Sequence, residues 1–191
     1  MLLGRRCIAD SSFTSRLTDI GHTSNLGWGI VLAYLTVTTQ ADVVDPGDGK
    51  LSLRKAVAKA NATATADTIV FAANIEGLTL TLTLGELLVT QDLTIDGDQD
   101  NNGIAVSIDG NHNGRILHIT GSGTEVALAD LTLTNARAPL GENGGAILLD
   151  GGGLVLNSTT IKNSSSGDLY NYGNVAGSDG GIYTGQVAAC L

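Results

Sequence analysis

A short acidic run, DGDQDNNG, carries the sharpest chemical pattern in this chain. It places Asp96, Asp98 and Asp100 at alternating positions. Oxygen ligands at the first, third and fifth positions of a tight turn are what a Ca²⁺-binding loop uses, because the turn points them inward. The full EF-hand pattern fails, since Asn101 stands where the turn needs glycine and Ser107 where it needs glutamate. The three aspartates are therefore candidate Ca²⁺ ligands, and the alternative is a solvated acidic turn between two layers of the fold.

A second group of residues could in principle carry acid–base chemistry. It comprises Asp109, His112, Arg115 and His118, and the three aspartates of the acidic run are candidates for the same chemistry. Hydrolysis of a glycosidic bond needs two carboxyl groups flanking that bond, and a lyase acting on acidic polysaccharides needs an Arg or Lys base beside bound Ca²⁺. His112 lies within DGNHNG and is most simply a turn residue, whereas His118 alternates with apolar neighbours and is most simply a strand residue. The signature dipeptides of the hydrolases and the Gly-His-Gly motif are absent, so we predict no catalytic residues.

The elements that must hold these residues form a repeat. Residues 126–135 read VALADLTLTN and residues 154–163 read LVLNSTTIKN, with a period of 28 (163 − 135). A fixed period of this size indicates one supersecondary unit stacked on itself, which makes a scaffold or a binding surface the first expectation for function. Short β-branched segments between Gly, Asn and Asp turns predict strands at 36–44, 68–72, 78–84, 87–90, 93–96, 106–109, 116–119, 126–128, 131–134, 146–149, 154–156 and 159–162.

The order of these segments predicts a coil with one helix near its start. The repeated segments are in register and lack hairpin symmetry, so we expect like strands to stack in parallel and the fold to be a parallel β-helix. Residues 51–61 predict a short helix, with the Ser52 hydroxyl as N-cap. Leu53, Val57 and Ala60 then share one apolar face. A helix here would cover the open first layer, whose strand edges are otherwise unpaired.

The corners of the coil carry two further predictions. Asn135 and Asn163 lie one period apart at strand ends and could stack as an amide ladder. The glycine pairs at 144–145 and 180–181 are 36 apart, so one layer carries 8 extra residues (36 − 28). We assign this insertion to a loop at 164–177, rich in Ser, Asn and Tyr, and expect binding there.

Composition narrows the class of protein. The chain has 191 residues, 42% of them hydrophobic, which is enough for one domain with a core. Its net charge is −9 and Arg5-Arg6 is its only basic cluster, so we exclude nucleic-acid binding through a basic face. Cys7 and Cys190 would lie at opposite ends of the stack, too far apart for an intrachain disulfide.

Residues 1–35 differ from the rest of the chain. The apolar run at 28–35 is too short for a transmembrane span, which takes ~20 apolar residues, but it has the length of a signal-peptide core. Asp10 and Asp19 count against a signal peptide. We therefore divide the chain into an N-terminal extension or signal-like segment, 1–35, and a parallel β-helix domain, 36–191, truncated at its C-terminal end.

Several motifs resemble one family. They are DGKLSLRKAV and AN within 48–61, DTIVF at 67–71, LTIDG at 93–97, GR at 114–115, GGAI at 144–147 and GGIY at 180–183. The first resembles the CSLREA-type N-terminal motif of bacterial exported right-handed parallel β-helix proteins. The GG units resemble the repeat of polymorphic outer-membrane proteins and related adhesins. The match spans about 36–184, with Leu51 in place of the family's Cys and Lys55 in place of its Glu.

This resemblance implies an all-β fold: a right-handed parallel β-helix (solenoid) with a short N-terminal capping α-helix. It implies a non-enzymatic, adhesin-type protein that is secreted or on the bacterial cell surface. Its role would be structural or the binding of a cell-surface polysaccharide or protein. The alternative is a carbohydrate-active polysaccharide lyase or hydrolase of the pectate-lyase-like β-helix class. We also expect an open C-terminal layer that associates with further chain or a partner.

Overall fold

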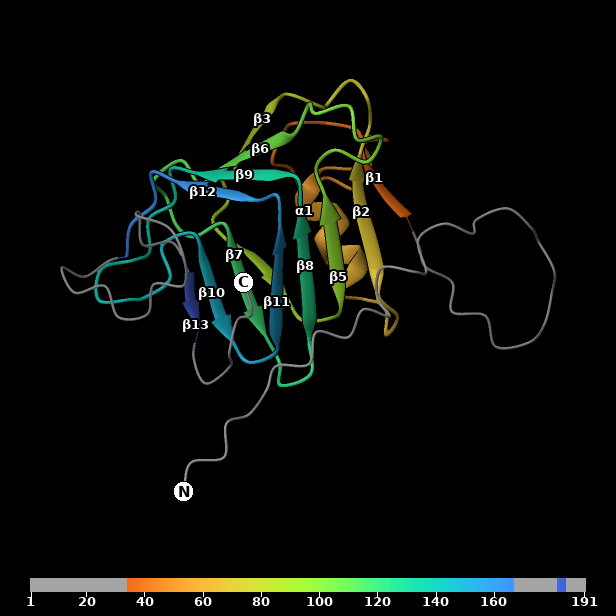
Figure 1. Ribbon diagram of the computed structural model, residues 1–191. Helices are drawn as coiled ribbons and strands as arrows, with labels where there is room; N and C mark the ends of the chain where they lie inside the picture. The colour runs from red at the N-terminus through yellow and green to blue at the C-terminus, as the bar shows by residue number, and fades with distance from the viewer. Residues whose placement is uncertain (1–33, 167–181, 185–191) are drawn as a thin grey trace.

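The computed structural model describes residues 34–166 and 182–184, which form a parallel β-solenoid of about 3 turns with one short helix near its N-terminal end (Figure 1). This confirms the predicted mostly-β parallel coil. The right-handed sense of the coil stays a prediction. Cys7, Cys190 and the predicted signal-like segment lie outside the described residues.

Three sheets run along the coil, and each turn adds one strand to each sheet. The first sheet has the order β1 (Tyr34–Val37), β2 (Asp67–Phe71), β5 (Leu93–Asp96), β8 (Glu125–Ala129) and β11 (Gly153–Asn157). The second has the order β12 (Thr160–Lys162), β9 (Leu131–Thr134), β6 (Val106–Asp109) and β3 (Thr79–Thr81). The third has the order β13 (Ile182–Thr184), β10 (Ile147–Asp150), β7 (Leu117–Thr120) and β4 (Leu87–Val89). We call them the first, second and third sheets.

Strand register confirms the period and locates the insertion. Leu154 pairs with Val126, an offset of 28 (154 − 126), in parallel strands. Ile182 pairs with Ile147, an offset of 35 (182 − 147). The last turn therefore holds 7 more residues than its period of 28 (35 − 28). They lie between β12 and β13, where the loop at 164–177 was predicted, and that loop beyond Ser166 lies outside the described residues.

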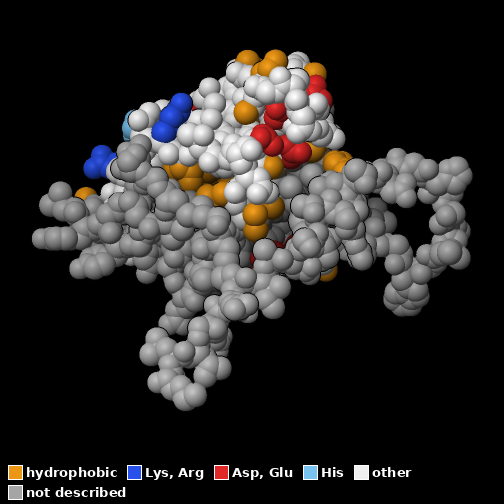
Figure 2. All heavy atoms as spheres, in the orientation of Figure 1, with side chains coloured by type: hydrophobic (Ala, Val, Ile, Leu, Met, Phe, Trp, Pro, Cys, Tyr) orange, Lys and Arg blue, Asp and Glu red, His pale blue; other side chains and the backbone are white. Residues whose placement is uncertain are grey.

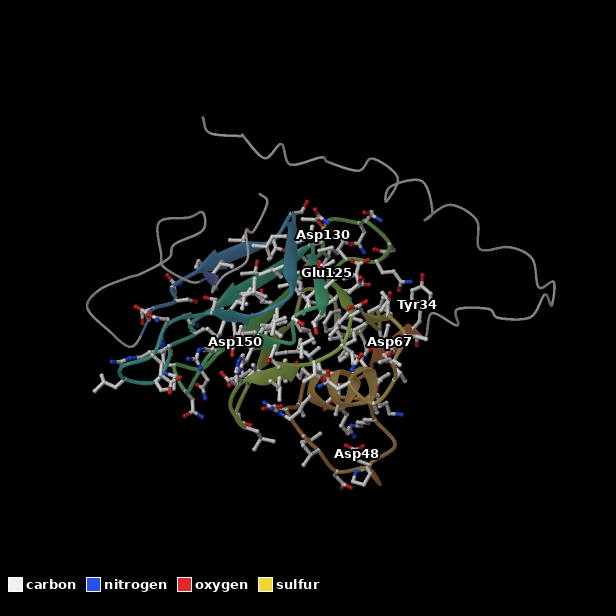
Figure 3. All side chains as sticks on the ribbon, turned by 90° about the horizontal axis from the view of Figure 1, so that it is seen from below. Tyr34, Asp48, Asp67, Glu125, Asp130 and Asp150 are labelled. Carbon is white, nitrogen blue, oxygen red and sulfur yellow. The ribbon has the colours of Figure 1, made fainter. Side chains whose placement is uncertain are left out.

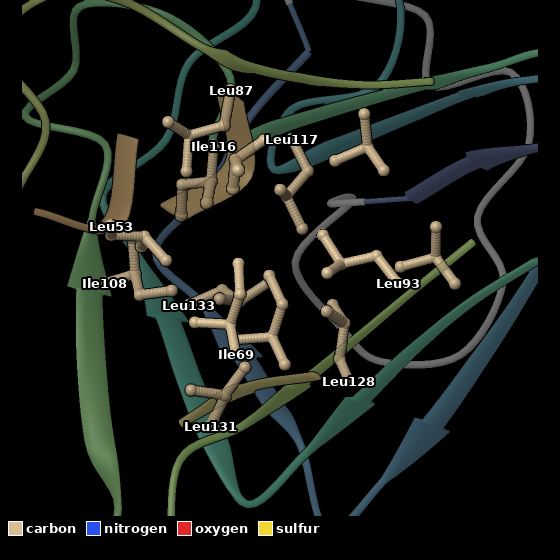
Figure 4. Packing of buried hydrophobic residues seen from close by; sticks show 14 of the residues in the cluster. Leu53, Ile69, Leu87, Leu93, Ile108, Ile116, Leu117, Leu128, Leu131 and Leu133 are labelled. Carbon is tan, nitrogen blue, oxygen red and sulfur yellow. The ribbon is translucent and has the colours of Figure 1, made fainter. Parts of the chain in front are cut away.

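Aliphatic columns fill the inside of the coil, because alternate residues of every strand point inward. One column of the second sheet runs through Leu80, Ile108, Leu133 and Ile161, which are paired in register. The side chains of Ile108 and Leu133 are fully buried, whereas Ile161, in the last described turn, is only partly buried. Figure 4 shows the inner members of these columns in contact with one another and with Leu53 of the helix.

Helix α1 (Leu53–Ala60) covers the first turn of the coil, as predicted. Its buried face is formed by Leu53, Ala56, Val57 and Ala60, and it contacts β1, β2 and β4. The hydroxyl of Ser52 accepts a hydrogen bond from the backbone N–H of Lys55, as an N-cap does. No helix within 34–166 is long and apolar enough to cross a membrane.

Three details of the coil differ from prediction. Strand β3 (Thr79–Thr81) is shorter than the predicted strand at 78–84. The first strand, β1, begins at Tyr34 and ends at Val37, so it is shorter than the predicted strand at 36–44. Asn135 and Asn163 both adopt the left-handed conformation, with φ of 54° and 52°. The Asn135 amide, however, donates to the Asp109 carboxylate at 2.8 Å, so the predicted ladder of stacked amides is wrong. An acceptor with full charge in the preceding turn outcompetes a neutral amide in the next one.

Candidate functional site

Within the described residues, three ion pairs meet in a cluster of charged side chains at the corner between the second and third sheets. Arg115 precedes β7 and its side chain is only 5% exposed. Its Nη1 donates to Glu86 Oε2 at 3.0 Å and its Nη2 donates to a carboxylate oxygen of Glu142. Its Nε donates to the backbone carbonyl of Asn143 at 2.9 Å. Glu86 belongs to the turn before Arg115 and Glu142 to the turn after, so one guanidinium joins three turns.

His118 extends this cluster onto the outer face of the third sheet. It pairs in register with Leu88 on one side and Leu148 on the other. Its Nδ1 lies 3.2 Å from Glu86 Oε1, so both oxygens of Glu86 are engaged. Its Nε2 is buried with no partner among the described residues. The aliphatic neighbours offer Nε2 no polar partner, and the contact with Glu86 turns the ring toward the corner.

A second arginine connects the cluster to the capping helix. Arg54 lies on α1, and its Nη1 donates to the backbone carbonyl of Glu86 at 3.0 Å. Its Nε and Nη2 also hold the Asp42 carboxylate at 2.7 Å and 3.0 Å. Asp42 accepts two further backbone N–H bonds, from Thr83 and Leu84, both at 2.8 Å. These hydrogen bonds hold helix α1, through Arg54, and the segment before it, through Asp42, against the loop between β3 and β4.

The electrostatics of Asp42 follow from this bonding. Burial by itself would raise the pKa of the Asp42 carboxyl. The hydrogen bonds from Arg54, Leu84 and Thr83, with the charge of Arg54, outweigh burial and hold that pKa below its usual value. The Asp42 carboxyl is therefore ionised, and it binds Arg54 and two backbone N–H groups rather than donating a proton.

The polar groups of this charged corner are used to join neighbouring turns of the coil. A general acid or base needs a free position facing the bond that it acts on. Arg115 uses three N–H groups on neighbouring turns, and Glu86 is shared between Arg115 and His118. Glu142 is the most open member, with 52% of its side chain exposed. A buried arginine needs such compensation, because an unpaired one would be strongly destabilising.

The acidic run at 96–100 lies at the corner between the first and second sheets, in the long loop that joins β5 to β6. Asp98 is buried, and its two oxygens accept from the backbone N–H groups of Asn102 at 3.0 Å and Gly103 at 2.8 Å. Asp96 accepts from the Asp98 N–H at 3.1 Å, and Asp100 from the Asn102 N–H at 3.2 Å. The three carboxylates therefore accept hydrogen bonds from backbone N–H groups of their own loop, and these bonds stabilise its conformation.

The pKa of the Asp96 carboxyl is raised, mainly because the group is partly buried. The hydrogen bond from the Asp98 N–H lowers this pKa, but the negative charges of Asp130 and Asp98 raise it.

Figure 2 shows acidic side chains gathered on this face, near the loops that Figure 1 draws beside β3 and β6. Within 34–166 and 182–184, no three His, Cys, Asp or Glu residues are grouped so that they could hold a metal ion. Ca²⁺ binding by Asp96, Asp98 and Asp100 stays a prediction.

The other acid–base candidates, Asp109 and His112, form no side-chain hydrogen bond or ion pair with Arg115, Glu86 or Glu142 within the described residues. Asp109 accepts from the Asn111 N–H at 2.6 Å and from the Asn135 amide at 2.8 Å. His112 is exposed in the adjoining turn, with a φ of 52°. Other carboxylates are equally dispersed, as the positions of Asp48 and Asp150 show (Figure 3). Of the four candidates, only Arg115 and His118 meet, and they do so through Glu86.

Sequence reasoning missed Glu86, Glu142 and Asp42. A weak signal was present for the first two. Glu86 stands directly before β4, Arg115 stands two residues before β7 one turn later, and Glu142 precedes β10, the next strand of that sheet. Opposite charges that recur at one corner of a coil predict ion pairs between successive turns. Here the corner loops differ in length, so the charged residues do not recur at a fixed spacing in the sequence.

Comparison of the chain with protein-family models, with curated proteins and with solved structures gives no match. The parallel coil therefore rests on the strand pairing itself, and the charged corner is interpreted from its own geometry.

Proposed function

We propose that this chain is the β-solenoid of a non-enzymatic surface or secreted protein, with a structural or binding role. The observation that carries this proposal is the charged corner, where Arg115, Glu86 and His118 are used to join successive turns. Groups committed to holding a scaffold together are poorly placed to move protons in a reaction. The motifs that resemble exported β-helix proteins support the location.

A binding role would fall on the outer faces of the sheets. On the second sheet, outward-facing hydroxyls from four successive turns align in one row: Thr79, Ser107, Thr132 and Thr160. Neighbouring strands lie ~4.8 Å apart, so the row offers regularly spaced donors and acceptors. Hydroxyls of this kind suit a polar ligand such as a cell-surface polysaccharide or a polar protein surface. We propose that this row of hydroxyls binds the ligand and that the core and the charged corner hold the successive turns in register beneath it.

The competing proposal is a polysaccharide lyase or hydrolase, and one observation favours it. Arg115, His118 and Glu86 do converge at one corner of the coil. The test is depolymerisation of uronate polymers by the full chain, with and without added Ca²⁺. We expect no turnover in either condition. Turnover that disappears in the Arg115→Lys variant, while the fold is kept, would establish the enzyme and overturn the scaffold proposal.

Binding is tested separately, with an immobilised uronate polymer and a neutral glucan as probes. A Thr132→Val substitution removes one hydroxyl from the middle of the row at nearly constant shape, and Thr94→Val does the same on the first sheet. We expect Thr132→Val to weaken binding and Thr94→Val to leave it unchanged. Equal effects of the two variants would show that the row is not the binding face.

A further inference from the structure

Three Asn-Gly pairs occur in the described part of the chain: Asn102-Gly103, Asn113-Gly114 and Asn143-Gly144. Asparagine followed by glycine is the pair most prone to spontaneous deamidation, because glycine has no side chain to hinder attack by its own backbone nitrogen. The chemistry is intrinsic to the dipeptide, so local structure decides which pair reacts. The three pairs therefore form an internal comparison within one molecule.

At Asn102-Gly103 both reacting groups are held. The Gly103 N–H, which would supply the attacking nitrogen, donates to Asp98 Oδ2 at 2.8 Å. The side-chain oxygen of Asn102 accepts from the Ile104 N–H at 2.8 Å. The carboxylate also disfavours loss of the amide proton, since the resulting anion would face a negative charge. This pair should be protected while the loop is folded.

At Asn143-Gly144 the backbone is confined. The Asn143 carbonyl accepts from Arg115 Nε, and Gly144 is buried. A Cβ placed on Gly144 would lie 2.6 Å from the Ile147 carbonyl oxygen, which shows how closely the chain packs there. Formation of a five-membered ring requires the backbone to rotate, and this packing opposes rotation.

Asn113-Gly114 has neither restraint. Asn113 is exposed in the turn between β6 and β7. Its backbone N–H donates to the Gly110 carbonyl at 3.0 Å, but neither its side-chain amide nor the Gly114 N–H bonds to another described residue. We propose that Asn113 is a site of spontaneous deamidation in the folded protein, and that it is the first of the three pairs to react. This inference is independent of the proposed function.

The reaction needs only water. The Gly114 amide nitrogen loses its proton and attacks Cγ of Asn113, and a bond forms between them. The bond from Cγ to Nδ2 breaks, and ammonia leaves with the proton. Water then opens the resulting succinimide at either carbonyl, which leaves aspartate or isoaspartate at position 113. Both products add a negative charge, and isoaspartate also lengthens the backbone by one carbon.

The lengthened backbone would disturb the charged corner. The Gly114 carbonyl accepts from the Arg137 N–H of the next turn at 3.0 Å, and Arg115 follows directly. Isoaspartate at position 113 would shift both the Gly114 carbonyl and Arg115. Deamidation in this loop should therefore weaken the contacts between this turn of the coil and the next one.

The test is incubation of the full chain at neutral and mildly alkaline pH, followed by proteolysis and mass spectrometry of the three Asn-Gly peptides. Incorporation of heavy oxygen from labelled water identifies hydrolysis of the succinimide. We expect Asn113 to deamidate several-fold faster than Asn102 or Asn143 in the folded chain. Equal or faster reaction at Asn102 or Asn143 would overturn the proposal.

Incubation in urea supplies the control for intrinsic reactivity. The three rates should converge in the unfolded chain, because glycine follows each of the three asparagines. An Asn113 rate far below its unfolded value would show that the turn protects it after all. In a folded Asp98→Ala variant, Asn102 should react faster while Asn113 is unchanged; an unchanged Asn102 would refute the protective role of Asp98. Asn113→Gln should abolish any loss of thermal stability on ageing.

Discussion

At the scale of single residues, the described carboxylates do not all support the fold. Asp42 is stabilised as an anion by Arg54 and two backbone N–H groups. Asp96 is in the opposite situation, since burial and the nearby charges of Asp130 and Asp98 raise its pKa. An acid whose pKa is raised on folding stabilises the protein only while it is protonated, and that contribution is lost as pH rises through the folded pKa.

Replacing Asp96 by Asn should therefore stabilise the protein at neutral pH. The Asn side-chain oxygen can still accept from the Asp98 N–H, but the partly buried negative charge is gone. Because the site is partly solvated, we expect a gain of only about 0.5 kcal/mol in the free energy of unfolding. Urea denaturation at neutral pH measures it, and the gain should shrink as the pH falls and wild-type Asp96 becomes protonated. Asp100→Asn in the exposed part of the loop is the control, and a less stable Asp96→Asn would contradict the argument.

Arg115 should resist conservative replacement. Lysine keeps the charge but carries a single ammonium group, which cannot reach Glu86, Glu142 and the Asn143 carbonyl together. We expect Arg115→Lys to cost about 1–3 kcal/mol, mostly through the partly buried Asn143 carbonyl left unpaired. Chemical denaturation followed by circular dichroism measures the loss. Lys162→Arg, at an exposed position on β12, is the matched control, and equal stability of Arg115→Lys and wild type would exclude the three-turn joint.

The sequence predicted some of these residues and not others for a physical reason. Ser52 was identified as the helix cap because capping is a local interaction between residues three apart. The partners of Arg115 lie 29 positions before it (Glu86) and 27 after it (Glu142). Which of several dispersed carboxylates meets an arginine depends on loop lengths at the corner, and those lengths follow no fixed period.

At the scale of elements, strands were predictable because alternation and the doubled unit reinforce each other. The segments at 93–96, 106–109 and 131–134 match β5, β6 and β9 at both ends. Corners were predicted less well, since their conformations depend on contacts between turns. Asp130 and Ser158, one period apart, both adopt positive φ, at 51° and 46°, without being glycine.

The corner between the first and second sheets, where Asp130 and Ser158 lie, requires glycine at position 97. A Cβ on Gly97 would lie 2.2 Å from the backbone carbonyl oxygen of Asp130, and a backbone atom cannot swing aside as a side chain can. Gly97→Ala should therefore force the second and third turns apart and cost about 1–3 kcal/mol. Gly123→Ala is the control, because nothing lies within 4 Å of its added Cβ. Thermal unfolding compares the two, and indistinguishable midpoints would show that the turns are not in such close contact.

At the scale of the whole molecule, the coil is stabilised unevenly along its axis. Each turn contacts only its neighbours, so stability is close to a sum of turn and interface terms. The first turn is covered by α1 and fixed by Arg54. Toward the other end, inward-facing Leu156 and Ile161 are only partly buried within the described residues. Local opening should therefore begin at β11 and β12 and reach β5 and β6 last.

Two isoleucines of one column provide a direct test of this gradient. Ile108 and Ile161 face inward on the second sheet, two turns apart, and differ in burial rather than in chemistry. Ile108→Ala should cost about 2–5 kcal/mol, since it leaves a cavity that the surrounding turns cannot close. Ile161→Ala should cost less than half as much, because its side chain gives up less contact and the last turn can relax. Denaturant unfolding measures both, with hydrogen exchange at β6 and β12 as the local readout. Equal costs would mean that the last described turn is as well covered as the middle of the coil.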